Sequence, residues 1–159
     1  MRRALPGAAI LVACMSMLSA CGDGATEPET SFDLTLTGDE TFQGAHGGQT
    51  IHVGVFEDGS DQLVADTTGT VSSESTPSFE FTFTDALTEG ESYTLDYWID
   101  SNFGGGTEGV CDSPDVDHQW RISLSSVTGN RTVDDTHRPT ETEAVCSSSS
   151  ASDGTNPGY

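Results

Sequence analysis

The sequence predicts an all-β domain, an antiparallel sandwich of two sheets with about seven short strands. Apolar and polar residues alternate with a period of two through the middle of the chain, which is typical of half-buried strands. Glycine and aspartate turns separate these segments, and no helical periodicity is present. Because strands with one apolar face must bury it, two packed sheets are expected. An immunoglobulin-like or transthyretin-like sandwich is favoured, and a small barrel is the alternative.

Each strand is predicted from its own pattern. The clearest alternation covers residues 32–36, 51–55, 79–83, 93–99 and 120–124, with weaker strands expected at 62–66 and 68–73. Their apolar positions hold mainly β-branched and aromatic residues, which suit a pleated, half-buried surface. The predicted sandwich therefore spans residues 31–140. A polar tether at 21–30 precedes it, and a mobile serine- and threonine-rich tail at 141–159 follows it.

The first 21 residues have the layout of an export signal. Two arginines lead into an apolar stretch that Pro6 and Gly7 interrupt, which leaves it too short to span a bilayer. Residues 18–21 (LSAC) resemble the lipobox of bacterial lipoproteins. The resemblance implies that residues 1–20 are a signal peptide and that Cys21 is acylated after cleavage. The mature protein would then be tethered to a membrane of the cell envelope, facing the periplasm or the exterior.

The charge balance excludes some partners. The chain has 26 acidic residues, five arginines and no lysine, and loss of the two signal arginines leaves a formal charge of −23. Such a surface repels nucleic acid, which binds proteins through lysine and arginine. Adaptation to high salt and cation binding both explain the acidity. The scattering of the acids favours the first explanation.

Cys111 and Cys146 are the remaining cysteines after the signal and the acylated Cys21. An oxidising compartment favours a disulfide between them, which would pin the tail. The alternative is a metal site, for which two cysteines without CxxC spacing are weak support.

An aspartate-rich loop at residues 100–118 is the densest cluster of candidate ligands. Asp100, Asn102, Asp112, Asp115 and Asp117 could supply the oxygen atoms that Ca²⁺ prefers, and a bound ion would order the loop. The spacing departs from an EF-hand, because the fifth and twelfth positions fall on glycine and cysteine. The alternative is that these side chains stabilise turns.

Residues 87–121 resemble secreted bacterial β-sandwich domains of unknown function. In those domains a strand ends in Asp-x-Asn-x-Asn-Gly, and an Asp-x-x-Pro-x-Asp-His-x-Trp-Arg segment follows. Here residues 97–104 read YWIDSNFG and residues 111–121 read CDSPDVDHQWR, and HGGQ at 46–49 extends the match. The Asn-Gly repeat is replaced by FGGG, which weakens a metal site carried over from it. The resemblance implies a β-sandwich and no particular activity.

The four histidines, His46, His52, His118 and His137, could in principle form a copper or zinc site. None has a ligand spacing such as HExxH, so separate histidines bonded within loops are the preferred interpretation. Trp98 alternates out of phase with its neighbours. It would bind a sugar ring or a protein if it faces outward, whereas a loop usually covers such a residue.

No residue is assigned a catalytic role, and the protein is predicted not to be an enzyme. The preferred function is a noncatalytic interaction or structural module, tethered by lipid, with a Ca²⁺-ordered loop. One alternative is a lipoprotein that binds a glycan or another solute through Trp98. A second is a metalloenzyme that uses His46 and His118, which requires the two rings to lie close together. Arg121 is expected to pair with a carboxylate, since guanidinium binds one bidentately.

Overall fold

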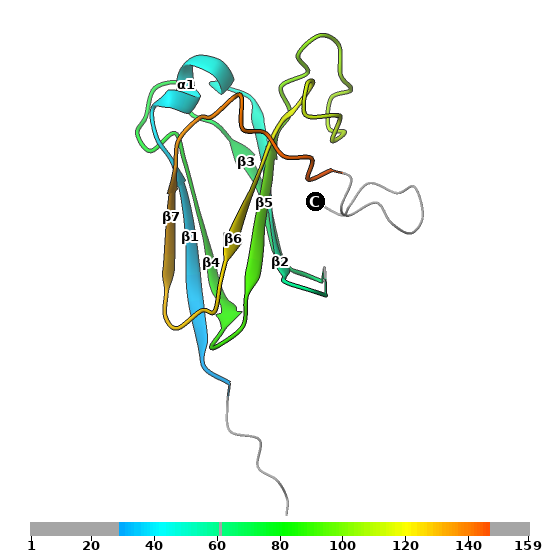
Figure 1. Cartoon of the computed structure of the whole chain (residues 1–159). Helices are drawn as coiled ribbons and strands as arrows, with labels where there is room; N and C mark the ends of the chain where they lie inside the picture. Colours follow the sequence, from blue (N-terminus) through cyan, green and yellow to red (C-terminus); the bar gives the residue numbers. More distant parts are fainter. Residues whose placement is uncertain (1–28, 61, 147–159) are drawn as a thin grey trace, which may run out of the picture.

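A computed structural model describes residues 29–60 and 62–146 of the 159-residue chain. The predicted signal peptide, Cys21, most of the tether and residues 147–159 lie outside the described residues. Within the described part, seven strands form two sheets, which pack face to face (Figure 1). The predicted all-β, two-sheet sandwich is therefore confirmed. The helix that the described residues form is too short to cross a membrane.

The three-stranded sheet has the order β4-β1-β7 and the four-stranded sheet the order β3-β2-β5-β6. All neighbouring pairs are antiparallel except β1 and β7, which are parallel. In chain order the elements are β1 (Ser31–Gly38), α1 (Thr41–His46), β2 (Thr50–Glu57), β3 (Leu63–Thr70), β4 (Phe79–Thr88), β5 (Tyr93–Ile99), β6 (His118–Leu124) and β7 (Arg131–Asp135).

The core lies between the two sheets and follows the predicted alternation. Leu34 and Leu36 of β1 face the interior, as do Val53 of β2 and Tyr97 of β5. Aromatic side chains fill the end of the core nearest α1, where the Phe42 ring meets Phe79 edge-on at 5.0 Å between centroids. Aromatic pairs of this kind add stabilisation beyond their buried area. This end of the sandwich is therefore a rigid base for the loops above it.

Three local predictions were wrong. The two weak strands expected at 62–66 and 68–73 are one strand, β3, paired along β2. The strand β7 was not predicted, because its sequence RTVDD has one apolar residue and its order comes from pairing with β1. A helix was not expected, and α1 is present with six residues. At that length helical periodicity leaves little trace in the sequence.

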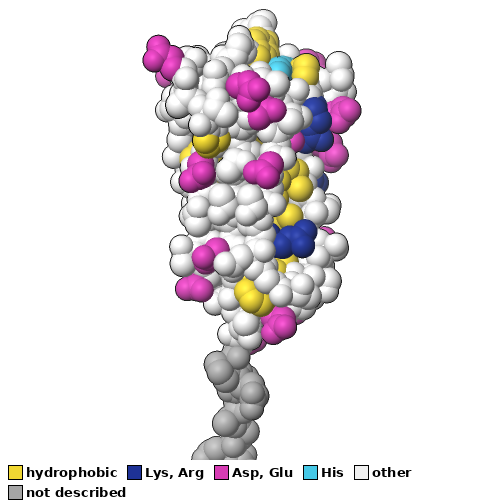
Figure 2. Space-filling model, turned by 90° about the vertical axis from the view of Figure 1, so that its left-hand side faces the viewer, with side chains coloured by type: hydrophobic (Ala, Val, Ile, Leu, Met, Phe, Trp, Pro, Cys, Tyr) yellow, Lys and Arg dark blue, Asp and Glu magenta, His cyan; other side chains and the backbone are white. Residues whose placement is uncertain are grey.

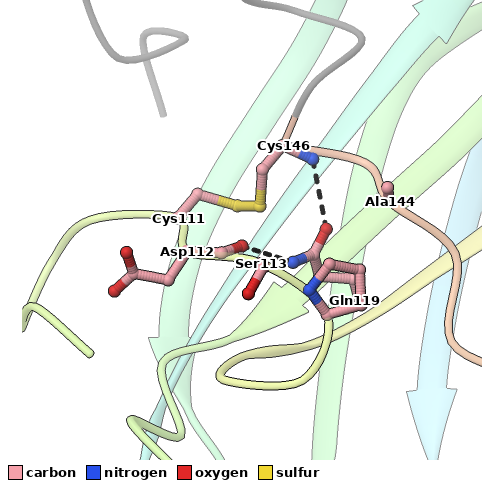
Figure 3. A pocket seen from close by; sticks show the side chains of 7 residues that line it. Cys111, Asp112, Ser113, Gln119, Ala144 and Cys146 are labelled. Atoms are coloured by element: carbon pink, nitrogen blue, oxygen red, sulfur yellow. Dashed lines mark hydrogen bonds between the residues drawn. A yellow bond between two sulfur atoms is a disulfide. The ribbon is translucent and has the colours of Figure 1, made fainter. Parts of the chain in front are cut away.

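The aspartate and disulfide predictions concern the loop between β5 and β6. Cys111 and Cys146 form the predicted disulfide, with their Cα atoms 5.6 Å apart. Beside it, the Gln119 side chain accepts a hydrogen bond from the Cys146 backbone N–H and donates one to the Asp112 carbonyl (Figure 3). The first residues of the tail, 141–146, are thus held against the loop by a covalent bond and by a buried amide.

Candidate metal centre

Three histidines from separate parts of the chain meet at the end of the sandwich that carries α1. His46 is the last residue of α1, His118 is the first residue of β6, and His137 lies two residues beyond β7. These three segments and the β5–β6 loop all lie at the same end of the molecule (Figure 1). Pairing of β1 with β7 and of β5 with β6 brings the segments together, although up to 91 residues separate them in sequence.

The local sequence places each ring. Phe42 and His46 are four residues apart on one face of α1, so both point toward the core. The helix begins where the Asp39 carboxylate accepts a hydrogen bond from the Thr41 backbone N–H at 2.9 Å. The hydroxyl oxygen of Thr41 in turn accepts a hydrogen bond from the His137 backbone N–H at 2.9 Å. The start of α1 therefore fixes the position of His137 as well as that of His46.

The three ring nitrogens form a small triangle. His46 Nε2 lies 3.0 Å from His118 Nδ1 and 3.0 Å from His137 Nε2, and the last two atoms are 3.2 Å apart. Each ring nitrogen directs one lone pair or one N–H along one line, so three good hydrogen bonds cannot form within such a triangle. A single cation at which three lone pairs converge would satisfy all three nitrogens.

The tautomer of His46 fits a ligand role. Its Nδ1 lies 2.6 Å from Gln49 Oε1, an atom that only accepts hydrogen bonds, so Nδ1 carries the proton and Nε2 presents its lone pair to the triangle. A hydrogen bond on the far nitrogen is the usual way in which a protein orients a metal-binding histidine. The Ser101 hydroxyl also lies 3.3 Å from His46 Nδ1.

The surroundings keep the imidazoles neutral. The pKa of His46 is lowered from 6.5 to about 4, chiefly by burial; the hydrogen bond to Gln49 acts in the opposite direction, and the neighbouring His137 and His118 add to the lowering. Burial also lowers the pKa values of His118 and His137. Since the neutral imidazole is the form that binds metal, all three rings are ready to bind at neutral pH.

An ion shared by these nitrogens would have three protein ligands and an open side. With metal–nitrogen distances of about 2.0–2.1 Å, it would lie about 1 Å off the plane of the triangle, with nitrogen–metal–nitrogen angles of about 90–105°. Those angles are compatible with a tetrahedral or a facial octahedral site. The Trp120 ring contacts all three histidine rings, at centroid distances of 6.2, 5.6 and 5.8 Å, and it belongs to the core. The open position therefore faces away from the core.

Among residues 29–60 and 62–146, these histidines are the one group of three or more histidine, cysteine, aspartate or glutamate side chains whose ligand atoms converge. The aspartates of the β5–β6 loop do not form such a group. The carboxylate of Asp117 instead accepts hydrogen bonds from the backbone N–H groups of Ser101, Asn102 and Asp112 at 2.9–3.0 Å.

The other predicted calcium ligands have separate positions in the same loop. Asp100 accepts a hydrogen bond from the Gly109 N–H and contacts the Asn102 amide, and Asp112 accepts one from the Thr107 N–H. Asp115 is exposed. The structure therefore gives three of the four aspartates the turn-stabilising role that was the alternative. Calcium binding by this loop stays a prediction.

The proposed open face at Trp98 is absent. Trp98 is 1 % exposed, and its ring stacks on that of His52 at 4.1 Å between centroids. It lies on the outer face of the four-stranded sheet, as its alternation indicated. Its register partner on β6 is Gln119, and the buried segment around Val145 is bonded to that glutamine. Trp98 is therefore covered, which was the usual case expected for such a residue, and the alternative of a solvent-facing Trp98 is contradicted.

The predicted pairing of Arg121 is confirmed. Its guanidinium binds the buried carboxylate of Asp96 bidentately, at 2.8 and 2.5 Å, and the two residues are register partners on β6 and β5. The role is structural, at the outer face of the four-stranded sheet.

Of the two residues named for a metalloenzyme, His46 and His118 do lie together, with ring centroids 4.9 Å apart. The third member, His137, was weighed only among all four histidines. No spacing motif could have found it, because the three residues come from three separate segments. The fourth histidine, His52, lies in β2 and stacks on Trp98 instead.

No protein-family model and no curated protein matches the chain. Among solved structures, the chain is similar to a fimbrial assembly protein from Parabacteroides distasonis, with 14 % identity and a TM-score of 0.40. The match covers 68 % of this chain and 53 % of the other, so this chain spans about half the length of that protein. This likeness is too remote to bear on the function.

Proposed function

We propose that this protein is a noncatalytic module that binds a divalent transition metal ion, Zn²⁺ or Cu²⁺, through His46, His118 and His137. The observation that carries the proposal is the triangle of three ring nitrogens with sides of 3.0, 3.0 and 3.2 Å. The ordinary alternative is a set of histidines that hydrogen-bond one another. Such a set cannot pair all three nitrogens, and it would place one buried and two partly buried neutral rings together with no gain from their convergence.

The donor set favours particular ions. Imidazole nitrogen suits zinc, copper, iron and nickel, whereas calcium and magnesium require oxygen ligands. Among divalent first-row ions, affinity for such a site rises from manganese to a maximum at copper and is lower for zinc. The net charge of −21 adds a general attraction for cations. Acidic side chains are scattered over the face shown in Figure 2, where a histidine lies among hydrophobic side chains at the end that carries α1.

Binding rather than catalysis is proposed because of the side chains around the rings. Phe42, Phe103 and Trp120 pack against the three histidines, and none of them can act as a general acid or base. The open coordination position would admit water or a donor atom from another molecule. Storage of the ion or its transfer to a partner needs no more than this.

We further propose that the module works outside the cytoplasm, held to a membrane by a lipid on Cys21. The resemblance of residues 18–21 to a lipobox supports the anchor. The disulfide between Cys111 and Cys146 supports an oxidising compartment, since such bonds are rare in the cytosol. Intact-mass measurement of the membrane fraction should show acyl chains on the protein, and Cys21→Ser should abolish them. An unacylated protein that keeps residues 1–20 would contradict the anchor.

Calorimetric titration with Zn²⁺ and with Cu²⁺ tests the metal site. The purified protein, freed of metal, should bind one ion of either metal per chain, and His137→Ala should lower the affinity by at least about 100-fold. His52→Ala is the matched control, because it removes the histidine outside the triangle. Equal affinities for the two variants, or binding without the one-to-one ratio, would contradict the proposal.

A further inference from the structure

The aromatic ring of Phe103 packs against two of the three histidines, His46 and His118, and is itself partly exposed to solvent. Its centroid is 5.8 Å from that of His46 and 5.0 Å from that of His118. Phe103 is 41 % exposed, whereas Phe42 and Trp120, which contact the same histidines, are buried. The core side of the triangle is therefore closed by buried rings, and Phe103 stands on the solvent side.

The backbone holds Phe103 in this place. Its N–H donates to the Val116 carbonyl at 2.9 Å, which ties it to the chain entering β6. The residues on either side, Asn102 and Gly104, have φ angles of 51° and 79°, in the left-handed region. The Asp117 carboxylate bonds the N–H groups of the two residues before Phe103. A large apolar side chain is thus exposed on a loop whose backbone is fixed by several hydrogen bonds.

Exposure of a phenylalanine in a fixed loop has no benefit for folding, because an apolar side chain gains stability by burial. A role at the open coordination position explains it. The hydrophobic shell around a metal site controls the access of solvent and the exchange of ligands. Phe103 lies on the His46 and His118 side of the triangle, so a bulky ligand that approaches the ion from that side meets its ring.

We propose that Phe103 is the cover of the open coordination position, and that it slows the exchange of the bound ion with bulky ligands while small ligands pass. The inference rests on the proposed metal site and deepens it. Phe103 donates no atom to the ion, so its effect is on rates and on ligand size rather than on the number of ligands.

Cobalt(II) is a suitable probe, because its visible absorption reports coordination by imidazole and the binding of a further ligand. In the Co²⁺-loaded protein, transfer of the ion to excess EDTA should become at least about 10-fold faster in Phe103→Ala. Azide should bind the wild type and the variant with similar affinity, whereas 2-methylimidazole should bind Phe103→Ala much more tightly. The equilibrium affinity for Co²⁺ should change by less than the release rate.

Val110→Ala is the matched control, since Val110 lies in the same loop and is also 41 % exposed. It should leave release and ligand binding unchanged. Release from Phe103→Ala at the wild-type rate would overturn the inference and leave the metal site intact. If Phe103→Ala lowers the affinity for Co²⁺ by the same factor by which it raises the release rate, the inference is also overturned. Phe103 would then act by holding the histidines in place rather than by covering the ion. Failure of the wild type to bind Co²⁺ would instead refute the metal site itself.

Discussion

The carboxylate of Asp117 offers a direct test of how the β5–β6 loop is ordered. The side chain is fully buried, and its two oxygens accept hydrogen bonds from three backbone N–H groups, at Ser101, Asn102 and Asp112. Asp117→Ala removes both acceptor oxygens and with them all three hydrogen bonds. A hydrogen bond to a charged group contributes about 1.5–3 kcal/mol when buried, and water can reach part of this loop, so about 1 kcal/mol is expected for each. The predicted loss is therefore about 3 kcal/mol.

Urea unfolding of the metal-free protein in EDTA measures this loss. With a denaturant dependence of about 1.5 kcal/mol per molar urea, a loss of about 3 kcal/mol lowers the midpoint by about 2 M. Asp115→Ala is the control, because Asp115 is exposed two residues away in the same loop. Exposed substitutions of this kind change stability by less than about 0.5 kcal/mol.

The two explanations of the acidic loop give opposite results in this assay. If Asp117 acts through backbone hydrogen bonds, the gap between Asp117→Ala and Asp115→Ala is present in EDTA and calcium does not change it. If Asp117 and Asp115 act instead as calcium ligands, both variants match the wild type in EDTA, and both gain less stability than the wild type when Ca²⁺ is added. Equal midpoints in EDTA would therefore refute the hydrogen-bond reasoning.

Three further predictions concern stability in the metal-free protein. The lowered pKa of His46, about 4 against 6.5 when unfolded, means that the unfolded chain takes up the proton first. The free energy of unfolding therefore keeps the full contribution of His46 above pH 6.5 and falls by about 2–3 kcal/mol as the pH drops toward 4. Urea unfolding midpoints should fall less over this pH range in His46→Gln than in the wild type. The same pH dependence in the variant and the wild type would contradict the prediction. Reduction of the Cys111–Cys146 disulfide, which closes a 35-residue separation, should lower the free energy of unfolding by about 4 kcal/mol, measured by urea unfolding with and without reductant. Arg121→Ala should cost at least about 2 kcal/mol by thermal unfolding, because the buried Asp96 carboxylate loses its bidentate partner. Replacement of the exposed Arg131 should cost far less.

The strands could be predicted where burial alone decides them. In β1, β2 and β5 each core residue alternates with a residue of the opposite face, so the sequence records the buried face directly. The β7 strand could not be predicted in the same way. This segment becomes a strand because it pairs in parallel with β1, almost 100 residues earlier in the chain. Its residues are mostly polar, so the sequence shows no alternation from which the pairing could be inferred.

The candidate metal centre was hidden from the sequence for a related reason. Metal motifs such as HExxH are recognisable because one helix presents both ligands, whereas His46, His118 and His137 depend on the packing of three segments. The short helix α1 was not expected, so the orientation of His46 toward Phe42 could not be inferred. Likewise, the outward alternation of Trp98 was read correctly, but the tail that covers it has no apolar pattern.

The structure assigns different tasks to the two sides of the histidine cluster. On the core side, Phe42 and Trp120 belong to the continuous aromatic packing of the sandwich, so the triangle has a rigid base with or without an ion. On the outer side, order comes from polar and covalent links in the β5–β6 loop, among them the Asp117 carboxylate and the disulfide of Cys111. Convergence of three lone pairs gives no stability by itself. A loop held by its own bonds can therefore keep the three nitrogens together in the metal-free protein, which lowers the cost of ordering the site when an ion binds.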